Sequence, residues 1–202
     1  MARATLHNRQ DSLEQALQIF WQKGFHATSL KDLEQAMDMR PGSIYATFGS
    51  KDALFQEALD YYARMAIAEL ERTLSKYPSS PLQGLAAYLR LLGSLRDQAL
   101  PSNACMLVKS LLELGVKEES ALCKVESMLA KIESRFTTSF IESQRIGELG
   151  RQLNPVLLAQ RLQAEVMGLR SFAQRKVDSS VVHEVAEAMA SSLDAMRIDN
   201  VG

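Results

Sequence analysis

The residues best suited to covalent chemistry are Cys105 and Lys109, four positions apart in the segment NACMLVKSLLELG. A cysteine at the start of a helix, one turn from a lysine, has its thiolate favoured by the helix dipole and by the positive charge. The spacing therefore predicts a thiol that reacts with electrophiles or oxidants. The alternative is a small buried side chain within an apolar run, and the sequence leaves both open. Cys123 lies in a long amphipathic segment and is expected to be buried and inert.

Motifs of the common enzyme and metal sites are missing from the sequence. His7, His26 and His183 are far apart and have no Cys, His or Asp at the spacing of a zinc site. The sequence contains no G-x-S-x-G elbow, no G-x-G-x-x-G and no Walker loop. We therefore predict no catalytic residues, no metal and no cofactor.

Composition and charge narrow the class of protein. The 202 residues are 47% hydrophobic, enough for a buried core, and the two cysteines fit a reducing compartment rather than a disulfide scaffold. No apolar stretch is long enough to span a membrane and no apolar leader is found, so we expect a cytoplasmic protein. With a net charge of −1, binding to DNA would depend on geometry rather than on bulk charge.

The segment DMRPGSIYATFGSK, residues 38–51, combines helix breakers with a dense aromatic cluster. Proline is favoured at the first position of a helix, where its missing N–H needs no partner, so a short helix is predicted over 41–48. Ile44 and Phe48 lie four residues apart and would anchor one face of this helix to a core. Its other face is small and polar and contains Arg40, Pro41, Ser43, Ala46 and Thr47. Such a face can enter the major groove of DNA.

The elements that would position this segment are helices. Apolar residues recur at helical spacing, so that 29–36 and 41–48 form a helix-turn-helix with 10–23 as the third side of its core. A long helix is expected over 51–76, followed by a break at 77–81. Further helices are expected at about 82–99, 104–114, 118–147, 155–175 and 179–197. No strand alternation is found, so the predicted fold class is all-α.

The residues T-S-L-K-D-L followed by G-S-I-Y-A-T-F-G-S-K-D-A-L-F resemble the TetR family of bacterial transcriptional regulators. The close match covers about residues 10–60, and the rest is similar only in the number and length of its helices. The resemblance implies a homodimer with an N-terminal three-helix helix-turn-helix domain over 1–50. A C-terminal helical domain over 51–202 would bind a ligand and dimerise, with 51–76 as the connecting helix.

The resemblance also implies roles for single residues at the DNA. Tyr45 and Lys51 match positions that hold the DNA backbone, and Thr28 and Ser29 match the phosphate-facing start of the first helix of the motif. Arg40 replaces the usual capping hydroxyl and provides a cation for a guanine edge or for a phosphate; both readings stay open. The full set expected at DNA is Thr28, Ser29, Arg40, Pro41, Gly42, Ser43, Tyr45, Thr47 and Lys51. The turn, where the family usually has glycine, contains Asp38, which tolerates left-handed geometry less easily.

Two further surfaces are expected in the C-terminal domain. Methionine-rich apolar walls suit adaptable binding of small ligands, and the middle helices offer such a set. It contains Tyr88, Leu91, Leu92, Leu95, Cys105, Met106, Lys109, Leu112, Met128 and Phe136. The last two helices have apolar faces that would either form a four-helix bundle with a second subunit or pack on their own subunit. These faces contain Leu158, Leu162, Val166, Leu169, Phe172, Val182, Val185, Ala186, Met189 and Leu193.

These features predict a DNA-binding transcriptional regulator, most simply a repressor that binds a palindromic double-stranded DNA operator as a homodimer. It would release the operator when a small-molecule effector or a thiol-reactive species reshapes the C-terminal domain. The alternatives are a thiol-reactive enzyme that uses Cys105 and a helical adaptor that makes only protein contacts.

Overall fold

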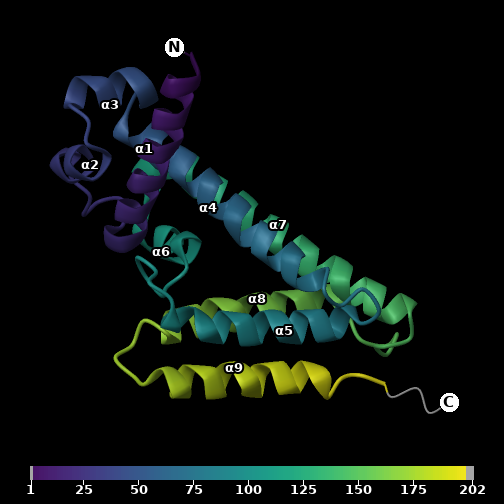
Figure 1. Cartoon of the computed structure of the whole chain (residues 1–202). Coiled ribbons are helices and arrows are strands. Elements are labelled where there is room, and N and C mark those ends of the chain that lie inside the picture. Colours follow the sequence, from purple (N-terminus) through teal and green to yellow (C-terminus); the bar gives the residue numbers. More distant parts are fainter. Residues whose placement is uncertain (1, 199–202) are drawn as a thin grey trace. The chain divides into compact units, whose positions relative to one another are not determined.

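The computed structural model describes the backbone of residues 2–198 and the side chains of residues 9–198. Over this range the protein contains helices and turns and no strand, so the all-α prediction is confirmed. The helices are α1 (Ala2–Lys23), α2 (Leu30–Met37), α3 (Pro41–Phe48), α4 (Lys51–Leu74), α5 (Pro81–Ser94), α6 (Met106–Glu113), α7 (Glu119–Arg145), α8 (Pro155–Phe172) and α9 (Ser179–Asp194) (Figure 1). The 3-10 helices are η1 (Leu95–Asp97) and η2 (Val116–Glu118). The helix predicted over 41–48 has the same bounds as the observed α3.

The chain packs into two compact units. The first consists of Met1–Met65 and Met106–Met128, and the second of Ala66–Cys105 and Leu129–Gly202. Helices α4 and α7 each provide residues to both units. The first unit therefore combines the helix-turn-helix with a segment from the middle of the sequence. The division of function at residue 50 stays a prediction.

Aromatic side chains hold the first unit together. The ring of Phe55 on α4 lies 5.0 Å from that of Phe20 on α1 and 4.8 Å from that of Phe25 in the following turn. Trp21 and Tyr62 pack edge to face with their centroids 5.0 Å apart. Large rings bury much apolar area and prefer such tilted arrangements. Helices α1 and α4 thus form the base on which the two short helices α2 and α3 are placed.

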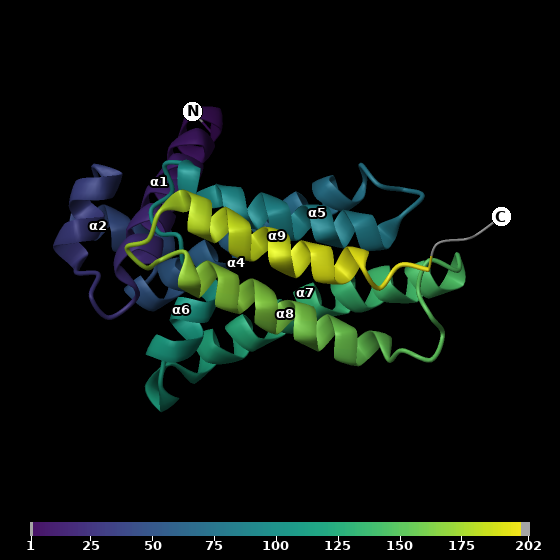
Figure 2. The ribbon, with the colours of Figure 1, turned by 90° about the horizontal axis from the view of Figure 1, so that it is seen from below.

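In the second unit, α5 and α9 lie side by side, with α8 next to them (Figures 1 and 2). The two helices approach closely because α5 has Gly93 where a Cβ would lie 2.5 Å from the Cβ of Ala186. Arg90 on α5 reaches across to Glu187, with its Nε 2.7 Å from Oε2, and to Asp194. Helix α5 therefore covers one side of α9 within the same chain.

This packing corrects half of the predicted dimer face, and the interface itself stays a prediction. Five of its residues belong to the core of their own unit, each at most 3% exposed: Leu162, Leu169, Val182, Ala186 and Leu193. The other five pack partly buried against that core: Leu158, Val166, Phe172, Val185 and Met189. The outer sides of α8 and α9 expose other apolar and small residues, namely Leu157, Ala164, Gly168, Val181 and Ala188. These five residues, unlike the buried five, are accessible to solvent in the single chain.

The expectation that Cys123 is buried is wrong, because its side chain is exposed. The buried residues in this part of α7 are Ala121, Val125 and Met128, which follow the helical repeat on one face. Cys123 lies two residues from Ala121 and Val125 and therefore points to the opposite side.

Candidate nucleic-acid interface

A capping box fixes the first turn of α2. The Oγ of Ser29 accepts the backbone N–H of Asp32 at 3.1 Å, and Oδ2 of Asp32 accepts the backbone N–H of Ser29 at 2.8 Å. The ammonium of Lys23, at the end of α1, donates to Oδ1 of Asp32 at 2.6 Å. The hydrogen bond from Lys23, followed by those from Ser29, holds the pKa of Asp32 far below its usual range. Asp32, which is charged at neutral pH, thus ties the start of α2 to α1.

The turn between α2 and α3 is made by Asp38. Its φ of 50° and ψ of 43° are left-handed, and among residues 2–198 no other non-glycine residue has a positive φ. The N–H of Asp38 donates to the carbonyl of Glu34, which closes α2. Asp is one of the few residues besides glycine that enters this region readily. The departure from glycine therefore keeps the turn geometry.

Helix α3 is anchored through Ile44 and Phe48, which are 1% and 5% exposed, so the predicted core face is confirmed. Arg9 on α1 supports this anchor, because its guanidinium lies 4.8 Å from the centroid of the Phe48 ring. The same guanidinium donates from Nη2 to both carboxylate oxygens of Glu57 on α4, at 2.8 Å. Helices α1 and α4 thus both contribute to the orientation of α3.

The other face of α3 is open. Arg40, Pro41, Gly42, Ser43 and Tyr45 are exposed, with Tyr45 at 46%, and Thr47 is half-buried. A Cβ built on Gly42 would meet no atom within 4 Å, so the backbone there is accessible to another surface. The side chain of Arg40 makes no capping hydrogen bond at the start of α3. The start of α3 therefore has small side chains and one cation, Arg40. A helix end of this kind can enter a major groove of DNA.

The residues expected at phosphate differ in their exposure. Thr28 is 1% exposed, and its hydroxyl donates to the carbonyl of Gly24 at 2.6 Å, so its side chain holds the turn and does not face solvent. Ser29 beside it is exposed. The ammonium of Lys51 lies 4.5 Å from the centroid of the Phe25 ring. Partial burial lowers the pKa of Lys51, against the charges of Glu113 and Asp32, which raise it.

Sequence analysis missed a contact between α6 and the end of α1. The ammonium of Lys109 donates to the carbonyls of Trp21 at 2.7 Å and Gln22 at 3.0 Å. Glu113, one turn later, accepts the backbone N–H groups that follow α1. Lys109 thus binds the end of α1, and its expected role beside the Cys105 thiol stays a prediction. The available signal was that α6 has only these two charged residues, four positions apart.

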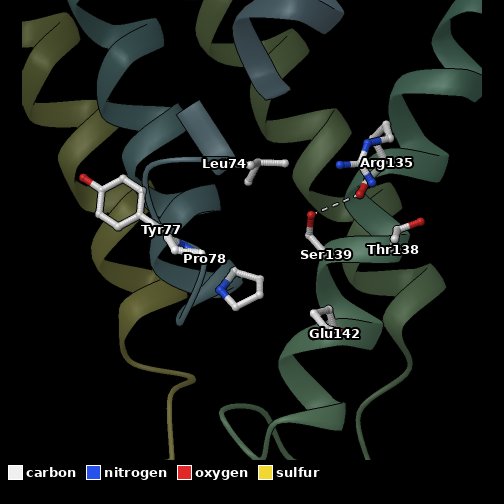
Figure 3. A pocket seen from close by; sticks show the side chains of 8 residues that line it. Leu74, Tyr77, Pro78, Arg135, Thr138, Ser139 and Glu142 are labelled. Carbon is white, nitrogen blue, oxygen red and sulfur yellow. Dashed lines mark hydrogen bonds between the residues drawn. The ribbon is translucent and has the colours of Figure 1, made fainter. Parts of the chain in front are cut away.

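The residues of the predicted ligand pocket divide between the two units. Tyr88, Leu91, Leu92, Leu95, Cys105 and Phe136 belong to the second unit, and Met106, Lys109, Leu112 and Met128 to the first. Tyr88 and Phe136 are core residues with ring centroids 6.2 Å apart, whereas Leu112 is 81% exposed and encloses nothing. A surface cavity of about 180 Å³ lies elsewhere in the second unit (Figure 3). It is lined by Leu74, Tyr77, Pro78, Pro81, Arg135, Thr138, Ser139 and Glu142.

Residues 13–58 match the sequence model of a known family, described as bacterial regulatory proteins, tetR family. The structure resembles that of a cysteine mutant of the TetR-family regulator CifR complexed with 26-base-pair operator DNA. The identity is 26% and the TM-score 0.83, over 91% of this chain and 95% of that one. The chain belongs to the TetR family.

Two curated relatives of this TetR-family chain are described as HTH-type transcriptional repressors. It is 24% identical over 184 residues to the HTH-type transcriptional repressor ComR of Escherichia coli, across 91% of this chain and 88% of that one. It is 25% identical over 160 residues to the HTH-type transcriptional repressor DhaR of a Mycobacterium species, across 79% of each. The chain is a transcriptional regulator with DNA as its partner and is not an enzyme. None of its described helices is both long and apolar enough to cross a bilayer.

Proposed function

We propose that this TetR-family regulator is a ligand-responsive repressor that binds a palindromic operator as a homodimer. The observation that carries the DNA part is the open face of α3, whose core anchors Ile44 and Phe48 are buried while Gly42 and Ser43 are accessible. ComR and DhaR are both named as repressors, which supports repression rather than activation. We place this activity in the cytoplasm.

At the DNA, we assign the contacts to the exposed residues of the predicted set. Arg40 and Ser43 reach base edges from the start of α3, because the first residues of a recognition helix enter the groove. Tyr45 and Ser29 contact the sugar–phosphate backbone. Lys51 reaches a phosphate by leaving the Phe25 ring. Thr28 takes no part through its side chain, because its hydroxyl is used within the turn.

The proposed dimer uses the outer sides of α8 and α9. Ala164 and Gly168, four residues apart on α8, and Val181 and Ala188, seven apart on α9, are exposed on these sides. Small residues permit the close approach that a four-helix bundle needs. In a two-fold dimer each patch meets its own copy, so these helices from two subunits would bury the faces that one subunit leaves open.

Regulation would be a shift between two conformations of the dimer. A repressor binds when its two recognition helices are spaced like successive major grooves, about 34–36 Å apart. A ligand that binds more tightly to a conformation with another spacing removes the protein from DNA. To move the balance from 1:99 to 99:1, the ligand must favour that conformation by about 5.5 kcal/mol. A thiol-reactive species at the half-buried Cys105 is the second candidate effector.

Selection of bound fragments from random double-stranded DNA tests the proposal. We expect an inverted repeat whose half-sites are one helical turn apart, with loss of enrichment when Arg40 and Tyr45 are replaced together by Ala. Lys76→Ala, an exposed cation in the second unit, is the matched control and should leave the selected sequence unchanged. A single half-site without symmetry would contradict the dimer. Absence of any enriched sequence would favour the adaptor alternative.

A further inference from the structure

Arg170 on α8 is a buried cation whose hydrogen-bonding capacity is only partly used. The residue is 7% exposed, and its Nε donates to the carbonyl oxygen of Asn103 at 2.6 Å. Its Nη2 is buried and has no hydrogen-bond partner among the described residues. No carboxylate of the described residues pairs with this guanidinium. Burial of an unpaired charge is unfavourable, so an anion from outside the chain would stabilise this guanidinium.

Other arginines of this chain show which anion fits. Arg90 binds Glu187 with Nε at 2.7 Å and Nη2 at 2.8 Å, and Arg145 binds Glu142 with Nε at 2.8 Å and Nη2 at 2.6 Å. In both pairs the same edge of the guanidinium donates two parallel hydrogen bonds to one carboxylate. In Arg170 that edge has a neutral carbonyl on Nε and nothing on Nη2. A carboxylate in place of the carbonyl would therefore accept hydrogen bonds from both donors.

The surroundings of Arg170 suit an acid with an apolar body. Its helix neighbours Leu169 and Ala173 are buried in the core of the second unit, which also includes Tyr88. Burial raises the pKa of the Tyr88 phenol, with a further increase from Cys105, while the charge of Arg170 opposes these effects. The phenol thus stays neutral and can donate a hydrogen bond.

We propose that Arg170 anchors a small organic acid, whose carboxylate replaces the carbonyl of Asn103 on the Nε and Nη2 edge. The site lies within the second unit and takes a monocarboxylate with an aliphatic or aromatic body. The proposal rests on the ligand-responsive function proposed above and gives the chemical class of the effector.

Entry of the acid would move the segment before α6. Gln174 holds this segment through its Oε1. This oxygen accepts hydrogen bonds from the hydroxyl of Ser102 at 3.2 Å and from the backbone N–H groups of Asn103 at 3.0 Å and Ala104 at 3.2 Å. Because the carbonyl of Asn103 occupies Nε, a carboxylate can accept from both Nε and Nη2 only when this segment leaves Arg170. The segment leads after one residue, Cys105, into α6. A ligand that binds only the moved conformation shifts the population toward it.

The test measures binding to the full chain by calorimetry in the absence of DNA. The probes are octanoate and benzoate, each compared with its primary amide, and inorganic phosphate. We expect the carboxylates to bind about tenfold or more tightly than the amides, because only they supply the counter-charge. Equal binding of acid and amide overturns the proposal. Binding of phosphate but of neither carboxylate assigns Arg170 to an inorganic anion and also overturns the organic-acid site.

Variants locate the binding. Arg170→Met should remove carboxylate binding while leaving Tm equal or higher, because a buried unpaired charge is replaced by an apolar chain of similar length. Arg175→Met, an exposed arginine after the same helix, is the matched control and should bind as the parent does. Gln174→Ala should tighten carboxylate binding by about threefold or more, since it frees the segment that must move. Unchanged binding in Arg170→Met, or weaker binding in Gln174→Ala, contradicts the site.

Operator release, measured separately, distinguishes the two proposals. Carboxylate binding without operator release contradicts the ligand-responsive function while leaving the acid site in place. Operator release by some other compound, without carboxylate binding, contradicts only the acid site.

Discussion

Gly24 and Glu113 lie so close that a Cβ on residue 24 would be 2.4 Å from Oε2 of the carboxylate. Gly24 ends α1 with a φ of +87°, a conformation that other residues rarely adopt. The carboxylate of Glu113 then accepts the next backbone N–H groups, from Phe25 at 2.9 Å and His26 at 2.6 Å. A residue of α6 thus completes the C-terminal turn of α1, which lies 87 to 88 residues earlier in the chain.

Gly24→Ala and Glu113→Ala should each lower the free energy of unfolding, by about 2 and about 1 kcal/mol. The double variant should lose less than the sum, because removal of the carboxylate also removes its clash with the new methyl group. Chemical denaturation of the four proteins measures the coupling. Strict additivity would show that the two residues do not meet in solution.

The DNA contacts should separate into two kinds. Tyr45→Phe and Lys51→Ala should weaken binding to all sequences alike, and Lys51→Ala should reduce the salt slope by about one unit. Arg40→Ala should relax preference at one base pair and cost about 1–3 kcal/mol on the best operator. Titration of operator and substituted operators at several salt concentrations measures both. A uniform loss in Arg40→Ala would reassign Arg40 to a phosphate.

The dimer face is best tested at a residue that is exposed in one subunit. Ala188→Arg should give monomers and lower operator affinity by about a hundredfold or more, because the second half-site no longer adds to binding. Ala130→Arg places the same change on an exposed position of α7 and should remain dimeric. Analytical ultracentrifugation distinguishes the two. A dimeric Ala188→Arg protein would move the interface away from α9.

The pH dependence of stability should reveal the charge on Asp32. Its folded pKa is depressed, so its contribution is fully present above the unfolded pKa of about 3.9 and is lost as pH falls toward the folded pKa. Asp32→Asn should therefore have a lower Tm than the parent at pH 7, and this difference should shrink below about pH 4. Asp178→Asn, whose side chain makes no capping hydrogen bond, is the control. A difference that stays constant down to pH 2.5 (about 1.4 units below that pKa) would rule out the charge as its cause.

A test of which cysteine senses the electrophile must measure operator release, because labelling alone does not identify the sensor. Cys123 is exposed and Cys105 is half-buried, so a thiol-selective electrophile will modify Cys123 readily whatever its role. If Cys105 is the sensor, operator release by the electrophile should persist in Cys123→Ser and be absent in Cys105→Ser. Release that survives in Cys105→Ser leaves a reversibly bound ligand as the effector.

The local features of the helix-turn-helix were predictable from sequence. Pro41 starts α3, Ile44 and Phe48 anchor it, and Ser50 caps α4 by accepting the N–H of Ala53 at 3.0 Å. Each of these signals acts within one or two turns of helix. Short-range chemistry of this kind determines where most of the helices begin and end. The largest difference is at α1, which begins at Ala2 and not near residue 10 as predicted.

Long-range pairing was not predictable. Periodicity shows that one side of α9 is apolar but not that α5 covers Val182 and Ala186, so buried residues were assigned to a dimer. Likewise, the spacing of Lys109 and Glu113 indicates a polar contact but does not identify its partner, the carbonyl of Trp21, 88 residues away. Arg170 is a further case, because nothing near it in the sequence indicates its burial or its hydrogen bond to the carbonyl of Asn103, 67 residues away.

The passage of the chain between its two units determines how the protein can be cut. The chain leaves the first unit after Met65, re-enters it at Met106 and leaves it again after Met128. A protease that cleaves once therefore cannot release the helix-turn-helix unit intact, and a fragment truncated after residue 65 lacks the Lys109 and Glu113 contacts that complete α1. Two of the three crossings lie inside continuous helices, α4 and α7, where a protease finds no extended backbone. The third crossing, at Cys105, is the one place where the chain passes between units outside a helix.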